Sequence, residues 1–201
     1  MLDLRRNCMS PMTEKILQAA IDVLNDKGIY YLSMREIAKK MDIKAATLYY
    51  HISRRQEIYN LISEYICGRM SYPEKIKDAK SLLIELNGNF RGELLKVRGS
   101  AEIFGETVPD TPRHLEFLKK TIEILSILGV KEESCFTAAN MLINYVLCFV
   151  MDEVYFKSVS RGKSQSAGTE FYRKNAAGMD YDRQFLYGLE VIIDGLRKNK
   201  Q

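Results

Sequence analysis

Residues 44–55 carry side chains that can bind the phosphates and base edges of a nucleic acid. Thr47, Tyr49 and His51 offer hydrogen-bonding groups, and Lys44 adds positive charge in the same stretch. Hydroxyl and imidazole groups can bind phosphate oxygens or base edges, whereas cations mainly contact phosphates. The candidate DNA-binding residues are Ser33, Arg35, Lys44, Ala45, Ala46, Thr47, Tyr49, Tyr50, His51 and Arg55.

Two short helices joined by a tight turn must position these side chains. Ser33 and Glu36 form a capping box that predicts a helix start, and Asp42 is a plausible turn residue because aspartate tolerates the left-handed conformation. Ser53 and Gln56 form a second capping box, which predicts the start of a further helix. The helix between them therefore has room for only about two turns, a length that suits a recognition helix.

Leu48 and Ile52 have the i, i+4 spacing that anchors one face of this middle helix on a core. The other faces remain for a groove, where Ala45 and Ala46 allow close backbone approach and contact with a thymine methyl. The alternative is a helical bundle with a solvated basic face. Caps, turn and exposed side chains agree over one continuous segment, so we favour DNA binding.

Residues 13–66 resemble the N-terminal DNA-binding domain of the tetracycline-repressor (TetR) family. The resemblance rests on Ala19-Ala20, Gly28, the run from Leu32 to Ala38 and the run from Thr47 to Ile52. It implies that the middle helix reads DNA and that the following helix links the DNA-binding and ligand-binding domains. Asp42 departs from the glycine usual in the family, and we expect the turn to survive.

The formal charge is concentrated in the same region. Through Arg55 the chain has ten Lys and Arg against six Asp and Glu, which gives +4, and the remainder has twenty of each sign. The whole excess charge of +4 therefore lies in the segment proposed to bind DNA, where cations govern salt-sensitive affinity.

Composition predicts a two-part protein of the cytoplasm. The 201 residues are 46% hydrophobic and 28% charged, enough for a large core beyond a small DNA-binding head. The N-terminus lacks the apolar region of a signal peptide, and the most apolar run, residues 141–154, is interrupted by polar residues. The four cysteines, Cys8, Cys67, Cys135 and Cys148, lack paired close spacing, so neither a metal site nor a disulfide framework is expected.

An enzyme is not expected, and no cofactor is implied. The two histidines, His51 and His114, lie in different parts of the chain, and neither a phosphate-binding glycine loop nor a nucleophile elbow occurs. His114 falls in a predicted first helical turn, where we expect a solvated surface residue.

The predicted fold is all-α: a three-helix helix-turn-helix domain over residues 1–67 and a larger helical ligand-binding and dimerisation domain over residues 68–201. Sustained strand alternation and internal repeats are lacking. Pro11 and Gly28 bracket the first helix, and Pro73 marks the break into the second domain. Residues 158–178, low in apolar content, are predicted to be a loop, either a lid or an inert linker.

The last two long helices, about 132–157 and 181–198, are apolar around most of their circumference. One stripe serves the subunit core and a second needs another partner. The family resemblance implies a four-helix interface between two copies of the chain. The predicted dimer-interface residues are Tyr145, Phe149, Phe185, Leu189, Ile192 and Leu196.

The runs 99–109, 147–153 and 185–190 resemble the ligand domain of the tetracycline repressors themselves, and this looser resemblance covers most of residues 81–196. The corresponding pocket positions are Ser71, Leu86, Phe90, Phe104, Thr107 and Asp152. Phe104 stands where the family has a magnesium-ligating histidine, and a phenyl ring cannot coordinate a hard cation. We therefore expect an apolar or aromatic effector that contacts Phe90, Phe104, Met141, Tyr145 and Phe149.

Together these features predict a dimeric, ligand-responsive regulator, most simply a repressor released from a palindromic DNA operator by a small molecule. The alternative is a helix-turn-helix DNA-binding protein whose C-terminal domain is controlled by a protein partner. The aromatic and methionine residues above could equally fill a core, as such residues commonly do.

Overall fold

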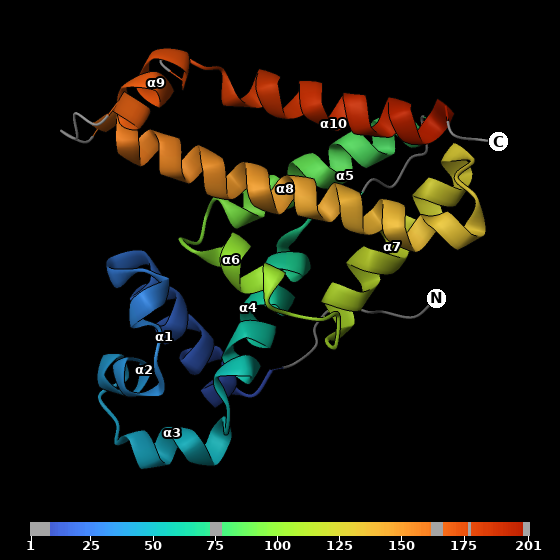
Figure 1. Ribbon diagram of the computed structural model, residues 1–201. Helices are drawn as coiled ribbons and strands as arrows, with labels where there is room; N and C mark the ends of the chain where they lie inside the picture. The colour runs from blue at the N-terminus through green and yellow to red at the C-terminus, as the bar shows by residue number, and fades with distance from the viewer. Residues whose placement is uncertain (1–8, 73–77, 162–166, 177, 199–201) are drawn as a thin grey trace. The chain divides into compact units, whose positions relative to one another are not determined.

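The computed structural model describes residues 9–72, 78–161, 167–176 and 178–198, and this part of the chain is helical without strands, as the sequence predicts. Cys8 and Pro73 lie outside the described residues. The helices, shown in Figure 1, are α1 (Pro11–Lys27), the 3-10 helix η1 (Ile29–Tyr31), α2 (Met34–Lys40), α3 (Ala45–His51), α4 (Arg55–Arg69), α5 (Ala79–Leu94), α6 (Ser100–Gly105), α7 (Pro112–Leu128), α8 (Glu132–Arg161), α9 (Ala167–Ala176) and α10 (Tyr181–Lys198).

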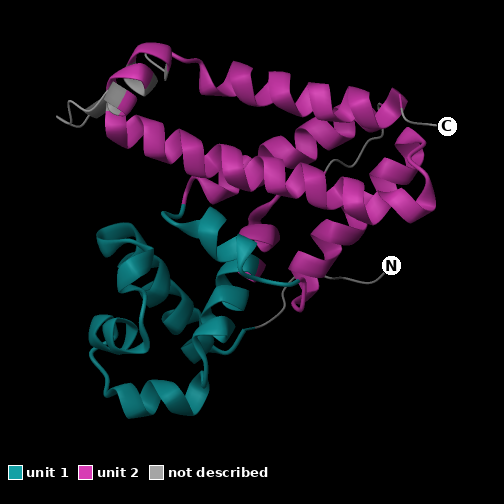
Figure 2. Cartoon of the chain, viewed as in Figure 1, with its two compact units in different colours: residues 1–63, 97–108 teal, residues 64–96, 109–201 magenta. Residues whose placement is uncertain are grey.

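The helices form two compact units, coloured separately in Figure 2. Unit 1 comprises residues 1–63 and 97–108, and unit 2 comprises residues 64–96 and 109–201. Helix α4 therefore contributes residues to both units, and the short α6 packs with the N-terminal helices although it follows α5 in the chain. The division of function at residue 67 stays a prediction.

Local capping explains the helix starts in unit 1. The Ser10 hydroxyl accepts from the backbone N–H of Thr13 at 3.2 Å before α1, and the Ser33 hydroxyl accepts from that of Glu36 at 3.3 Å before α2. Only this half of the predicted capping box is observed, because the Glu36 carboxylate binds the Lys27 ammonium instead. Gly28 ends α1 with φ of 88°.

The start of α4 differs from the predicted Ser53–Gln56 capping box. Ser53 donates its hydroxyl to Glu57 Oε1 at 2.6 Å and its backbone N–H to Glu57 Oε2 at 3.3 Å. Gln56 instead donates its side-chain amide to the carbonyl of Glu106 at 3.1 Å. The predicted box is wrong, because the side chain that accepts from the Ser53 N–H is Glu57, one residue later, while the Gln56 amide points to the Glu106 carbonyl.

The residues on both sides of α6 hydrogen-bond to the other helices of unit 1. On one side, the Arg98 N–H donates to Asn25 Oδ1 at 3.0 Å. On the other, the Thr107 hydroxyl donates to the Phe104 carbonyl at 2.8 Å and lies 3.1 Å from the Ser63 hydroxyl. The segment therefore ties the end of α1 to α4.

Unit 2 is built on α5, α7, α8 and α10, with α8 and α10 side by side (Figure 1). Its core includes the rings of Phe90 and Phe117, with centroids 4.7 Å apart. The predicted loop at 158–178 is corrected here: α8 continues to Arg161 and α9 occupies Ala167–Ala176, while residues 162–166 lie outside the described part. Low apolar content does not prevent a helix when one face alone needs packing.

The N-terminus of α7 is capped from another helix. Thr111 occupies the capping position but its side chain makes no capping bond. The α4 residue Glu64 replaces it, since its Oε2 accepts from the backbone N–H groups of Arg113 at 2.8 Å and His114 at 3.4 Å. A carboxylate is favourable there because it faces the positive end of the helix dipole.

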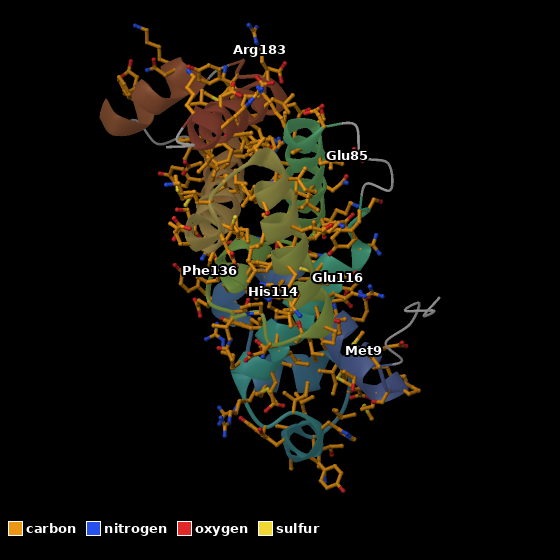
Figure 3. The ribbon with its side chains drawn as sticks, turned by 90° about the vertical axis from the view of Figure 1, so that its right-hand side faces the viewer. Met9, Glu85, His114, Glu116, Phe136 and Arg183 are labelled. Atoms are coloured by element: carbon orange, nitrogen blue, oxygen red, sulfur yellow. The ribbon has the colours of Figure 1, made fainter. Side chains whose placement is uncertain are left out.

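The prediction that His114 is a solvated residue was wrong, because its side chain is only 5% exposed. Figure 3 labels His114 and Glu116, which both belong to α7. Burial lowers the pKa of His114 to about 4, although the charges of Glu64 and Asp110 act in the opposite direction.

We expect this histidine to make unit 2 acid-sensitive. Unfolding restores its ordinary pKa of 6.5, so between about pH 6.5 and 4 the unfolded chain binds more protons and stability falls as pH falls. The loss approaches roughly 3 kcal/mol at the acid end of that range. We expect the free energy of unfolding, measured with urea at a series of pH values, to fall less steeply with decreasing pH in His114→Gln than in the wild type. Equal slopes would contradict the assignment.

Candidate nucleic-acid interface

Helices α2 and α3 form the predicted helix-turn-helix. Asp42 has φ of 54°, which is the left-handed conformation expected at the turn. The next residue, Ile43, donates its N–H to the carbonyl of Ala38 at 3.0 Å and closes the end of α2. Helix α3 is seven residues long, with Leu48 and Ile52 buried as the i, i+4 spacing predicts.

Burying Leu48 leaves the polar faces of α3 open. Tyr49 is 52% exposed and Tyr50 is 89% exposed, and the rings of Tyr50 and His51 form a T-shaped pair with 5.4 Å between centroids. Lys44, Ala46, Thr47 and His51 are also exposed, and Ala45 is partly exposed. A large aromatic side chain gains by burial, so tyrosines held in solvent on a short helix indicate a surface that binds something.

Cations flank this surface. Arg35 at the start of α2 and Arg54 before α4 are exposed. The guanidinium of Arg55 lies over the Tyr59 ring at 5.0 Å, which orients the side chain without neutralising its charge. By contrast Lys40 is paired with Asp26 at 2.9 Å, so part of its charge is already compensated within unit 1.

Two further exposed tyrosines escaped the sequence analysis. Tyr30 is 98% exposed and Tyr31 is exposed in η1, directly before the Ser33 cap. The signal that could have identified them is their position between Gly28, which ends α1, and the Ser33 cap, in a three-residue 3-10 helix with no buried residue.

The predicted ligand-binding residues are distributed over the two units. Phe104 and Thr107 belong to unit 1, where Phe104 is buried. In unit 2, Leu86 and Phe90 are buried, Tyr145 and Phe149 are partly buried, and Ser71, Met141 and Asp152 are exposed. The pocket assignment stays a prediction. Among the described residues, no three His, Cys, Asp or Glu side chains gather closely enough to hold a metal ion.

Unit 2 also contains a charged cluster, with a buried Arg–Glu pair at its centre, that was not predicted from the sequence. Arg91 on α5 forms ion pairs with Glu153 on α8 at 2.8 Å and with Asp182 on α10 at 2.7 Å. The neighbouring Asp152, which was predicted as a pocket residue, is exposed. Apolar spacing gives no sign of this arrangement, because its three members are distant in sequence.

The apolar surface of unit 2 differs from the predicted dimer interface. Phe185 and Leu189, predicted to face a second copy, are buried within their own subunit, and Ile192 and Leu196 are partly buried. The exposed apolar side chains of α10 are instead Leu186, Tyr187 and Val191. Those of α8 include Phe136, at the edge of the molecule in Figure 3, Met141, Val154 and Tyr155. Phe185 and Leu189 are therefore core residues, and the assignment of the partly buried Tyr145, Phe149, Ile192 and Leu196 to a dimer interface stays a prediction.

Residues Glu132–Val159 of α8 are long and apolar enough to cross a membrane by composition alone, with a mean hydropathy of 1.6. Of its most apolar window, 44% is buried inside the subunit. The exposed side of α8 is interrupted by polar residues such as Asn144.

Comparison with known proteins gives matches along nearly the whole chain. The family model described as bacterial regulatory proteins, tetR family, matches residues 16–61, and the model of the tetracyclin repressor-like C-terminal domain matches residues 72–200. The tetracycline repressor protein class A from transposon 1721 of Escherichia coli is 26% identical over 195 residues, which is 92% of this chain and 90% of the relative.

Solved structures share the fold. ActR of Streptomyces coelicolor in complex with actinorhodin superposes with a TM-score of 0.76 at 22% identity, covering 96% of this chain and 99% of that one. BioQ with its double-stranded DNA operator superposes with a TM-score of 0.72 at 23% identity, covering 93% and 98%.

The turn geometry predicts the response of Asp42 to substitution. Valine is β-branched and strained at positive φ, whereas glycine adopts this conformation without strain. We expect Asp42→Val to lower the free energy of unfolding by about 1 to 2 kcal/mol relative to Asp42→Gly. Urea unfolding of the two variants side by side provides the measurement, and equal midpoints would be inconsistent with a left-handed turn at this residue.

Proposed function

Because the chain belongs to the TetR family of transcriptional regulators, we propose that it is a dimeric repressor that a small molecule releases from a palindromic operator. The family is one of DNA-binding regulators and not of enzymes. The observation that carries the proposal is α3: a seven-residue helix anchored by Leu48 that holds Tyr49 and Tyr50 in solvent. Its place of action is the cytoplasm, where the DNA is.

In this proposal α3 enters the major groove. Thr47, Tyr49 and His51 hydrogen-bond phosphate oxygens or base edges, and Ala45 and Ala46 allow close approach. The remaining candidates position the protein on the backbone: the Ser33 hydroxyl still has a proton to donate while its oxygen caps α2. The residues assigned to the phosphates are Ser33, Arg35, Lys44, Tyr50 and Arg55.

A second copy provides the two-fold symmetry of the proposed operator. Two recognition helices read successive major grooves when they are about 34 to 36 Å apart. The exposed apolar side chains of α8 and α10, including Met141, Tyr155, Leu186, Tyr187 and Val191, supply a self-complementary surface for this dimer. Burial of this surface also removes an exposed apolar face that would otherwise promote aggregation.

The effector is proposed to be an apolar or aromatic small molecule. Among the candidate contacts, Phe104 supplies apolar surface in unit 1, where the hydroxyl of Thr107 provides a polar group held by its bond to the Phe104 carbonyl. ActR was solved with actinorhodin, a precedent for a small-molecule ligand on this fold. A ligand that prefers the DNA-free arrangement lowers DNA affinity by linkage. The comparisons do not favour control by a protein partner.

Selection from a random duplex library tests the DNA-reading role of α3. We expect enrichment of a palindrome and loss of at least tenfold in affinity for it in Tyr49→Ala, as for one base-contacting side chain. Tyr30→Ala removes an exposed tyrosine of the same unit outside α3, so its sequence preference should match that of the wild type. Absence of any enriched sequence would remove the proposal.

The phosphate role of Lys44 predicts a distinct change. Lys44→Ala should weaken binding to every sequence alike and reduce the slope of log affinity against log salt by about 1. Lys120→Ala, which removes a cation paired with Glu123 on α7, should leave the slope unchanged. Titrations over a salt series provide the measurement, and equal slopes for Lys44→Ala and the wild type would rule out a phosphate contact.

A further inference from the structure

Arg91 on α5 bonds to two other helices at once. Its Nε and Nη2 donate to Glu153 Oε2 on α8 at 3.0 and 2.8 Å, and its Nη1 donates to Asp182 Oδ1 on α10 at 2.7 Å. Arg91 is 9% exposed and Glu153 is 2% exposed, whereas the side chain of Asp182 is 83% exposed. The buried pair thus extends to a surface carboxylate in the first turn of α10.

Aromatic rings fix the plane of this guanidinium. Its central carbon lies 5.5 Å from the ring centre of Phe149 on α8 and 4.9 Å from that of Phe185 on α10. A planar guanidinium suits such a site because it stacks on rings while its N–H groups bond in the plane. Arg91 therefore sets an orientation as well as a distance between α8 and α10.

The two helices are in close contact beside this cluster. The Tyr145 hydroxyl on α8 donates to the carbonyl of Phe185 on α10 at 2.8 Å. A Cβ added at Gly188 would lie 2.4 Å from that hydroxyl, so only glycine fits there without a shift. Small sliding movements of α10 along α8 would break this contact.

A second ion pair holds the other end of α10. Lys80 near the start of α5 donates to both carboxylate oxygens of Asp194 near the end of α10, at 2.9 and 3.0 Å. The start of α5 thus pairs with the end of α10, and the end of α5 pairs with the start of α10. Helices α5 and α10 therefore run antiparallel, with an ion pair at each end. The face of α10 that carries Leu186, Tyr187 and Val191 remains exposed.

We propose that Arg91 is a positioning residue that sets the register of α10 against α8, so that their exposed apolar side chains form one surface for a second copy of this chain. Buried ion pairs contribute little net stability compared with apolar residues of similar size, and their best-attested role is to specify register. The inference rests on the proposed dimer and names the residue that shapes its interface.

The test compares dimer dissociation constants, measured by sedimentation over a concentration series, for the full chain and its variants. Arg91→Met/Glu153→Met removes both buried charges together. The charged partners it leaves behind are Asp182, whose side chain is 83% exposed, and Lys157, which pairs with Glu153 at 2.5 Å and is 49% exposed. The subunit should therefore remain folded. We expect a rise in the dissociation constant of about tenfold or more, the size of one lost coupling of ordinary strength.

Two further variants distinguish a role in positioning the helices from an effect of charge alone or of subunit stability. Arg91→Lys keeps the charge but has no planar group to bond both helices, so it should also weaken the dimer. Lys120→Met/Glu123→Met removes an exposed pair within α7 and should behave as the wild type. Circular dichroism and urea unfolding at concentrations where monomer predominates report the fold of the subunit.

An unchanged dissociation constant for Arg91→Met/Glu153→Met, with or without a loss of monomer stability, would overturn the positioning role while leaving the dimer intact. A wild-type chain that stays monomeric at all concentrations would instead refute the proposed dimer, and the inference with it.

Discussion

A helix of seven residues does not persist alone in water, and the proposed DNA-binding surface of this protein is one such helix. Helix α3 exists because Leu48 and Ile52 are buried in unit 1 and because the left-handed residue Asp42 delivers the chain to its start. These two apolar side chains on one face are enough to pack α3 against unit 1. The other faces are then available for hydroxyl, aromatic and basic side chains.

Unit 2 faces the opposite problem, since its long helices have more apolar surface than one subunit can cover. Helix α10 turns Phe185 and Leu189 toward its own subunit and leaves Leu186, Tyr187 and Val191 outside. An apolar face can slide without much change in energy, because the hydrophobic effect is non-directional. Directional hydrogen bonds and ion pairs from α5 supply the register that apolar packing alone does not.

Sequence reasoning succeeded where the physical cause is local. Ser10, Ser33 and Gly28 act through neighbouring backbone groups, so the ends of α1 and the start of α2 could be predicted from a few adjacent residues. It failed where a distant group competes. Gln56 is taken by the carbonyl of Glu106, and a carboxylate from α4 caps the helix start that buries His114.

The difference between local and distant causes also explains how far the charged residues could be interpreted from the sequence. Net charge along the chain correctly separates a basic N-terminal segment from a neutral remainder. In the neutral remainder, cations are paired with carboxylates that are distant in sequence, as Arg91 is with Glu153 and Lys80 is with Asp194. In unit 1, Lys40 is paired with Asp26, while exposed Arg35 keeps its charge for a partner. Electrostatic attraction to a polyanion therefore depends on which cations are left uncompensated, and fewer of them act at long range than a count of Lys and Arg suggests.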